Sequence, residues 1–381
     1  MRSFRGPLDG RSGLRAAAVP LPAALIAGLL AVPLGAQTPS PPPSALVNQR
    51  SAETLERARA LSPRTNEESL AYFREEIDAA LVGAIGRVWD PTRPRGESPR
   101  KPWGDPDLEG YWLNLGYTPL ERPEALADTP LYAPEEAIEV FQRAIAEDAA
   151  VDPATVHYDW KEFGMDNWQS PVRPNRRTGL VVDPPDGKLP PLTPAGQARL
   201  AAQARRHTLE TRNLYERCVT GNQGPPRLPF NHDSESHIVQ TEDHVLIMTQ
   251  ANSEVRVIPL DGRPRGPGNI RRWLGDPRGH WEGDTLVVES MNFHEDRKWR
   301  GAAGDMHLVE RFTRVDADTL LYEATVTDPS TWEAPWTVEV PWPRIEPPLF
   351  EFACHEQNYG IINVLNGARI RAREYEAQQD N

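Results

Sequence analysis

Several residues in the C-terminal half combine acids, bases and cations in ways that could support catalysis. The densest group contains His232 and Asp233, which could form a base oriented by a carboxylate. Glu310 and Arg311 could serve as an acid and as a group that stabilises an anion. His355 is a second candidate base. As one alternative, this set predicts a hydrolase or lyase that works without an organic cofactor.

Metal binding is weakly indicated, and only at His232 and His237. The four residues between them do not place both imidazoles on one face of a strand. The chain also lacks a Gly-x-Ser-x-Gly elbow, a His-Glu-x-x-His pair, a phosphate-binding Walker loop and a dinucleotide fingerprint. We therefore expect no cofactor and no metal.

Short apolar segments separated by tight, often acidic turns occupy residues 236–356. They amount to about eight strands with hairpin-length connections, so neighbouring strands should be antiparallel. We expect a mainly β fold with N-terminal helices, built as an up-and-down, lipocalin-like barrel or as a two-sheet sandwich. The segments are His237–Thr241, His244–Gln250, Val255–Pro259, a stretch around Trp281, Thr285–Met291, His307–Val315, Leu320–Thr327, Trp336–Trp342 and Leu349–His355.

Alternation along these segments predicts which side chains face inward. In Leu320–Thr327 the apolar residues share one face, which leaves Glu323 on the solvated face. In His307–Val315, Leu308 and Phe312 share their face with Glu310. A buried carboxylate needs a cationic or hydrogen-bonding partner, or its pKa rises. Glu310 should therefore belong either to a structural ion pair between strands or to the polar lining of a pocket.

The first 36 residues read as a signal peptide. A cationic leader precedes an apolar run from Ala16 to about Leu34, which ends at Gly35-Ala36. The run is short and interrupted by prolines, so an uncleaved membrane anchor is the less favoured alternative. We expect a periplasmic or secreted protein. The leader's cations are Arg2, Arg5, Arg11 and Arg15.

Composition divides the rest of the chain. We expect a disordered spacer at 37–48, a helical extension at 49–89, a proline-rich linker at 90–107, a β-rich main domain at 108–370 and a flexible tail at 371–381. The main domain should begin with a strand near residues 108–115 and contain helices at about 134–148 and 193–213. An apolar stripe in the extension could pack on the main domain or bind a protein partner.

The chain has two cysteines, Cys218 and Cys354. In an oxidising compartment they could form one disulfide. The alternatives are two buried thiols or, less favoured because no Cys-x-x-Cys spacing is present, a redox pair.

The net charge of the chain limits the kinds of partner that it can bind. The formal charge is −13, and loss of the leader's four Arg and one Asp would move it to about −16. Such a chain repels nucleic acid and anionic membrane surfaces. After signal cleavage we therefore expect neither as a partner.

A set of motifs occurs in order along residues 103–370. They are TPLERP at 118–123, VDPPDGK at 182–188, ERC at 216–218, IPLDGR at 258–263, WEGDTLVVE at 281–289, HLVERFTRVD at 307–316 and ACHEQNY at 353–359. In these the chain resembles an uncharacterised family of secreted, β-rich bacterial proteins. The resemblance implies export and a β-rich body, and it carries no activity or catalytic residue.

Together these features favour an exported protein that binds a small apolar or amphipathic molecule in a β cavity with a few polar groups. Eleven tryptophans could supply its aromatic walls. The cofactor-independent enzyme and the protein-interaction module are the alternatives.

Overall fold

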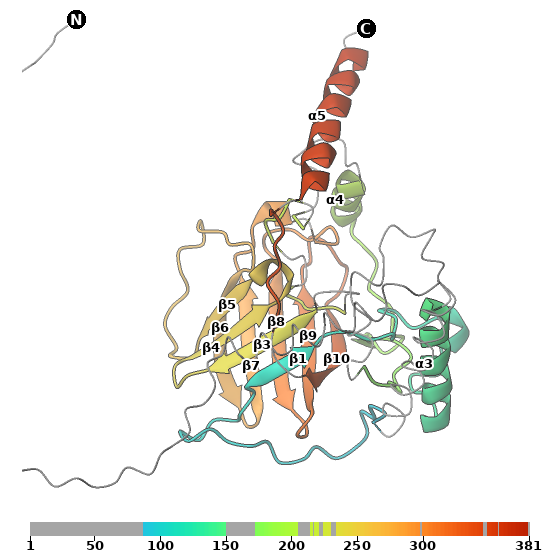
Figure 1. Cartoon of the computed structure of the whole chain (residues 1–381), viewed down its shortest axis with the longest axis vertical. Helices are drawn as coiled ribbons and strands as arrows, with labels where there is room; N and C mark the ends of the chain where they lie inside the picture. Colours follow the sequence, from blue (N-terminus) through green and yellow to red (C-terminus); the bar gives the residue numbers. More distant parts are fainter. Residues whose placement is uncertain are drawn as a thin grey trace, which may run out of the picture. The chain divides into compact units, whose positions relative to one another are not determined.

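A computed structural model describes residues 87–149, 172–204, 214–215, 217–220, 224–229, 234–297, 299–345, 349–356 and 358–379. The expected signal peptide, the spacer and most of the helical extension lie outside the described residues. Within them, the protein is built around one antiparallel sheet of ten strands (Figure 1). The mainly β fold class and the antiparallel pairing predicted from the sequence are confirmed.

The strands follow one path across the sheet. In spatial order they are β5 (Val255–Pro259), β4 (His244–Thr249), β3 (Glu235–Gln240), β1 (Gly110–Leu113), β10 (Trp336–Ile345), β9 (Thr319–Thr327), β8 (His307–Arg314), β7 (Thr285–Met291) and β6 (Asp276–Glu282). The tenth strand, β2 (Val181–Asp183), pairs with β10 at Thr337 and Val338, whereas β1 pairs with the other end of β10. The long strand β10 therefore supports two short strands along one edge.

Turn chemistry sets the hairpins in this sheet. β6 and β7 meet at Gly283, whose φ of 60° lies in the left-handed region that glycine adopts without steric cost. Between β8 and β9, the Asp316 carboxylate accepts a hydrogen bond from the backbone N–H of Asp318 at 2.8 Å. Such local turns fix the register of each pair, so inward and outward residues alternate as the sequence predicts.

The sheet curls so that its two halves face each other across one hydrophobic core. In Figure 1, β1 and β3 cross in front of the strands β7 to β9. Ile238 and Ile247 from one half belong to the same buried cluster as Leu308 and Phe312 from the other. The largest fully buried side chains include Trp112, Trp336, Trp342 and Tyr322. Aromatic rings therefore fill much of the space between the halves.

The two end strands, β5 and β6, approach each other without forming a ladder in the described sheet. A Cβ added to Gly279 of β6 would lie 2.8 Å from Ile258 Cγ2 of β5, so glycine is needed for this close approach. Arg278 donates to the carbonyl oxygens of Arg263 at 3.0 Å and Pro264 at 2.6 Å, in the segment that follows β5. The expectation of a closed barrel or a two-sheet sandwich of about eight strands is therefore wrong. The side-chain hydrogen bonds of Arg278 connect β6 to the segment that follows β5, in place of the backbone hydrogen bonds that would close a barrel.

Three α-helices and three short 3₁₀ segments accompany the described sheet. Helix α3 matches the predicted helix at 134–148, and α4 starts at Pro194 as predicted; residues 205–213 lie outside the description. None of the described helices is long and apolar enough to span a membrane. The bounds are α3 (Pro134–Ala149), α4 (Pro194–Ala204), α5 (Tyr359–Gln379), η1 (Glu124–Leu126), η3 (Ala251–Ser253) and η4 (Glu295–Arg297).

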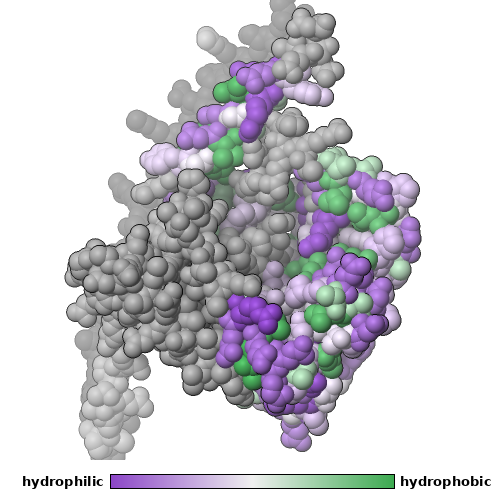
Figure 2. Space-filling model, turned by 90° about the vertical axis from the view of Figure 1, so that its right-hand side faces the viewer, coloured by the Kyte–Doolittle hydropathy of each residue, from purple (hydrophilic) through white to green (hydrophobic). Residues whose placement is uncertain are grey.

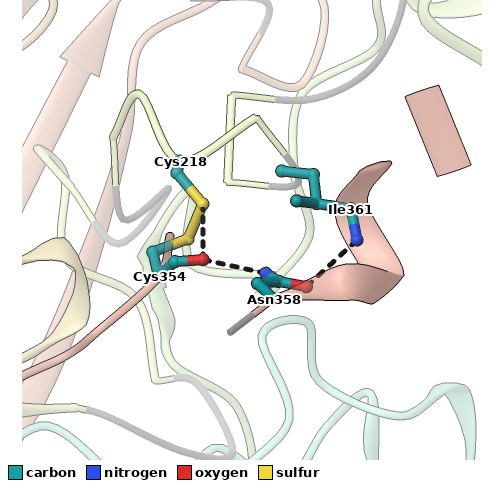
Figure 3. Close-up of a disulfide and its surroundings, with 4 residues drawn as sticks. All are labelled: Cys218, Cys354, Asn358 and Ile361. Carbon is teal, nitrogen blue, oxygen red and sulfur yellow. Dashed lines mark hydrogen bonds between the residues drawn. A yellow bond between two sulfur atoms is a disulfide. The ribbon is translucent and has the colours of Figure 1, made fainter. Parts of the chain in front are cut away.

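The C-terminal segment differs from the prediction in two ways. Leu349–His355 forms no strand, and α5 extends through residues assigned from the sequence to a flexible tail. A disulfide joins Cys218 to Cys354, which confirms the bridge among the three alternatives (Figure 3). The side chain of Asn358 connects the bridge to α5, because it donates to the Cys354 carbonyl at 2.8 Å and accepts from the Ile361 N–H at 3.0 Å. Asn358 therefore caps the first turn of α5.

The described surface mixes polar and apolar residues. Figure 2 shows both kinds interspersed over the coloured part of one face. Individual exposed apolar side chains, such as Val257 at 49% and Ile270 at 51%, are ordinary on protein surfaces.

Candidate functional site

Glu310 of β8 is the most deeply buried carboxylate of the described core, with no exposed surface. Arg256 of β5 binds both its oxygens, with distances of 3.0 Å to Oε1 and 2.5 Å to Oε2. The Tyr322 hydroxyl of β9 donates to Oε1 at 3.0 Å. The sequence prediction that a buried Glu310 requires a cationic or hydrogen-bonding partner is thus confirmed, and it has both.

On β5 the charged residue, Arg256, faces the core and its apolar neighbours face outward, which is the opposite of the usual arrangement. Its neighbours Val255 and Val257 face outward and are about half exposed, whereas Arg256 faces the core and is 6% exposed. Its guanidinium also donates to Ser290 Oγ at 3.2 Å. Burial alone would lower the pKa of Arg256, but the adjacent Glu310 carboxylate outweighs it and raises that pKa above its ordinary value. Arg256 is therefore a permanent cation inside the sheet.

Tyr322 links Glu310 to the proline-rich loop that precedes β3. Its hydroxyl accepts a hydrogen bond from the backbone N–H of Arg227 at 2.8 Å. Burial, followed by the nearby Glu310, raises the pKa of Tyr322 well above its ordinary value. The phenol is therefore neutral at physiological pH and can donate to Glu310 while it accepts from the loop.

Two more arginines lie beside this network. Arg227 is 2% exposed; its guanidinium donates to Thr249 Oγ1 and lies 5.3 Å from the centre of the Trp342 ring. Arg297 donates to the Pro225 carbonyl and lies 5.0 Å from the Phe293 ring centre. Burial lowers the pKa of each guanidinium to about 10, so both remain charged at neutral pH.

We call Arg227, Arg256 and Arg297 the arginine cluster. Glu310 and Glu254 act electrostatically on all three guanidiniums. Three buried or partly buried cations therefore share the influence of these two carboxylates. The Nε atoms of Arg227 and Arg256 are also buried without a hydrogen-bond partner. Both properties are unusual for charges removed from water.

The structure separates the candidate catalytic residues that it describes. Glu310 points into the core, whereas its neighbour Arg311 is on the outer face, where it forms an ion pair with Glu282. His355 is exposed in the segment before α5. His232 and Asp233 lie outside the described residues. Glu310, Arg311 and His355 thus do not share one cleft.

His237, a weak metal candidate, stacks on Tyr111 with ring centres 4.1 Å apart. Burial lowers the pKa of His237, against the influence of Glu109. Within the described part of the chain, no three His, Cys, Asp or Glu side chains come together as a metal site. The other weak candidate, His232, is not described.

One hollow of about 20 Å³ lies beside β10 and has room for roughly one water molecule. Its walls include Trp89, Arg173, Asn175, Thr319 and Val340. Cavities that enclose drug-sized ligands are roughly 300–1,000 Å³. This hollow is therefore too small for the expected ligand.

Sequence reasoning found Glu310 and missed all three arginines of the cluster. Arg256 carried a weak signal, because Val255-Arg-Val-Ile258 alternates but does not show which phase is buried. Arg227 lies in a loop and Arg297 in the three-residue 3₁₀ segment η4, where no periodicity indicates the direction of a side chain.

Comparison with known proteins gave no match: neither a protein-family model nor a curated protein is similar to this chain. The functional argument therefore depends on the geometry of the site.

Proposed function

We propose that the protein is exported and binds a small amphipathic molecule at the arginine cluster, near the partly exposed Arg297. The observation that carries the proposal is the group of three buried or partly buried guanidiniums, two of which, Arg227 and Arg297, lie against aromatic rings. A ligand with one polar end and one apolar part would match both features.

The energetic cost of the cluster supports a role beyond folding. Moving an ion out of water costs on the order of several kcal/mol, and well-packed apolar side chains often replace a buried ion pair without loss of stability. Buried perturbed arginines beside a buried carboxylate are therefore a reasonable marker of a functional site.

We favour the edge of the core as the place where the ligand binds. Trp342 and Tyr322 are fully buried and occupy the interior, whereas Arg297 is partly exposed. Arg297 lies against the buried rings of Phe293 and Trp299, whose centres are 5.0 and 5.6 Å from its guanidinium carbon, so its surroundings are apolar. The enzyme alternative has less support, because Glu310 and Arg311 are on opposite faces of the sheet.

The test is mass spectrometry of the protein exported with its own leader. Native spectra should show a small molecule bound to the wild type, and denaturation should release it. The Arg297→Met variant should carry at least ten times less. Arg263→Met is the matched control, since Arg263 is exposed and pairs with Asp261 in a turn. Equal amounts of released molecule from wild type and Arg297→Met would refute the site.

A further inference from the structure

We infer that the ligand is an organic anion whose carboxylate, or a similar oxyanion, binds to the arginine cluster. This inference rests on the proposed function and adds the chemical class of the ligand. It depends on the charge and the free donors of the cluster, not on its aromatic walls.

Charge is the first argument. Arg256 is neutralised by Glu310 through two hydrogen bonds. Glu254 can offset one further guanidinium among the three that it influences. Arg227 and Arg297 donate hydrogen bonds to neutral oxygens, those of Thr249 and Pro225. Charge interactions in such a buried region are stronger than in bulk water. A bound anion would supply the balancing charge.

Unused donors are the second argument. Arg227 and Arg256 are each at least nine-tenths buried, and the Nε–H of each has no hydrogen-bond partner. A guanidinium presents its donors in a planar fork that matches a carboxylate or phosphate. An oxyanion at the cluster could satisfy donors that the described protein groups leave unused.

Access is the third argument. Arg227 and Arg256 are buried, while Arg297 is partly exposed, so a ligand from solvent would meet Arg297 first. Arg297 also bonds to the Pro225 carbonyl, two residues before Arg227. This bond holds the loop that carries Arg227 next to η4.

The acidic character of the whole chain makes the inference specific. A net charge of −13 repels anions at long range. Anion binding would therefore require a local concentration of positive charge, which the cluster provides. Because the cluster is buried, salt should weaken the binding less than it weakens binding to exposed cations.

The experiment compares matched acids and alcohols by calorimetric titration of the purified full-length chain. The probes are benzoate against benzyl alcohol, decanoate against decanol, and inorganic phosphate alone. At least one acid should bind ten or more times tighter than its alcohol. Arg297→Met should abolish the difference, Arg297→Lys should retain part of it, and the control Arg263→Met should leave it unchanged.

The outcomes separate the two proposals. Alcohols that bind as tightly as their acids would overturn the anion inference and leave small-molecule binding in place. Failure of both acids and of phosphate to bind would also overturn it, while mass spectrometry of the copurified molecule decides the proposed function independently. Phosphate binding equal to that of the acids would support oxyanion recognition and remove the need for an apolar part.

Discussion

Arg256 on β5 reaches across the core to Glu310 on β8, so a buried ion pair links two strands that are far apart on the path of the sheet. Between them along that path lie β4, β3, β1, β10 and β9. The pair therefore joins the two facing halves of the curled sheet where backbone pairing does not.

Glu310→Gln should lower the free energy of unfolding by about 3–5 kcal/mol, because it leaves the buried Arg256 without a carboxylate. Urea unfolding would measure the loss. Replacing both residues, as Arg256→Met with Glu310→Leu, should cost less than the single change, since no uncompensated charge remains. Glu282→Gln is the control on the outer face, where Arg311 stays solvated, and its effect should be much smaller. Equal effects of the two Glu→Gln changes would contradict this role for the buried pair.

Gly279→Ala should destabilise the protein by roughly 1–3 kcal/mol through overpacking between β6 and β5. The new methyl group would lie 2.7 Å from Leu260 Cδ2 and 2.8 Å from Ile258 Cγ2. Thermal unfolding of the variant, alone and with Leu260→Ala, would test this, because the second change removes one of the two clashes. Gly268→Ala, which meets only Asn292 Oδ1 at 4.0 Å, should change little. A neutral Gly279→Ala would show that the end strands are not held in contact.

Removing the disulfide should lower stability on the order of 5 kcal/mol, because the bridge closes a span of 136 residues in the unfolded chain. Reduction or the double change Cys218→Ala with Cys354→Ala should lower the urea midpoint. The double variant should no longer respond to reductant. Since Cys354 lies just before α5, reduction should also speed proteolysis between residues 349 and 358. Unchanged midpoint and cleavage rate would show that the bridge adds nothing to the folded state.

Local sequence signals predicted most of the strands. The bounds of β5 and β7 agree with the prediction, because the turns at Asp261-Gly262 and Gly283-Asp284 mark where a strand must stop or start. Burial of Glu310 with Leu308 and Phe312 also followed from alternation alone. These features depend on residues that are close in the chain.

Features set by distant residues were not predictable. Alternation in Leu349–His355 suggested a strand, but the sequence does not show whether a sheet edge is free to receive it; both sides of β10 are already paired. Whether the sheet closes into a barrel depends on how β5 packs against β6. That packing involves the close approach at Gly279 and the side-chain hydrogen bonds of Arg278, which no local pattern predicts. The arginine cluster gathers residues from a loop, a strand and a 3₁₀ segment, so no single pattern contained it.

Glu323→Gln should stabilise the protein more at pH 7 than at pH 4. Burial, followed by Glu339 opposite it on β10, raises the pKa of Glu323 above its ordinary 4.5. The folded state therefore holds this proton more tightly than the unfolded state, and stability falls as pH rises from about 4.5 through the folded pKa. Glutamine does not ionise, so Glu323→Gln removes this loss of stability at pH 7. Urea unfolding of both proteins at the two pH values would measure it.

Glu282→Gln provides a control of opposite sign. Hydrogen bonds from Arg311 and then His280 lower the pKa of Glu282, so its ionised form favours the folded state. Loss of that charge should matter more at pH 7 than at low pH. If Glu323→Gln and Glu282→Gln showed the same pH trend, the raised pKa of Glu323 and the like-charge influence of Glu339 on it would both be refuted.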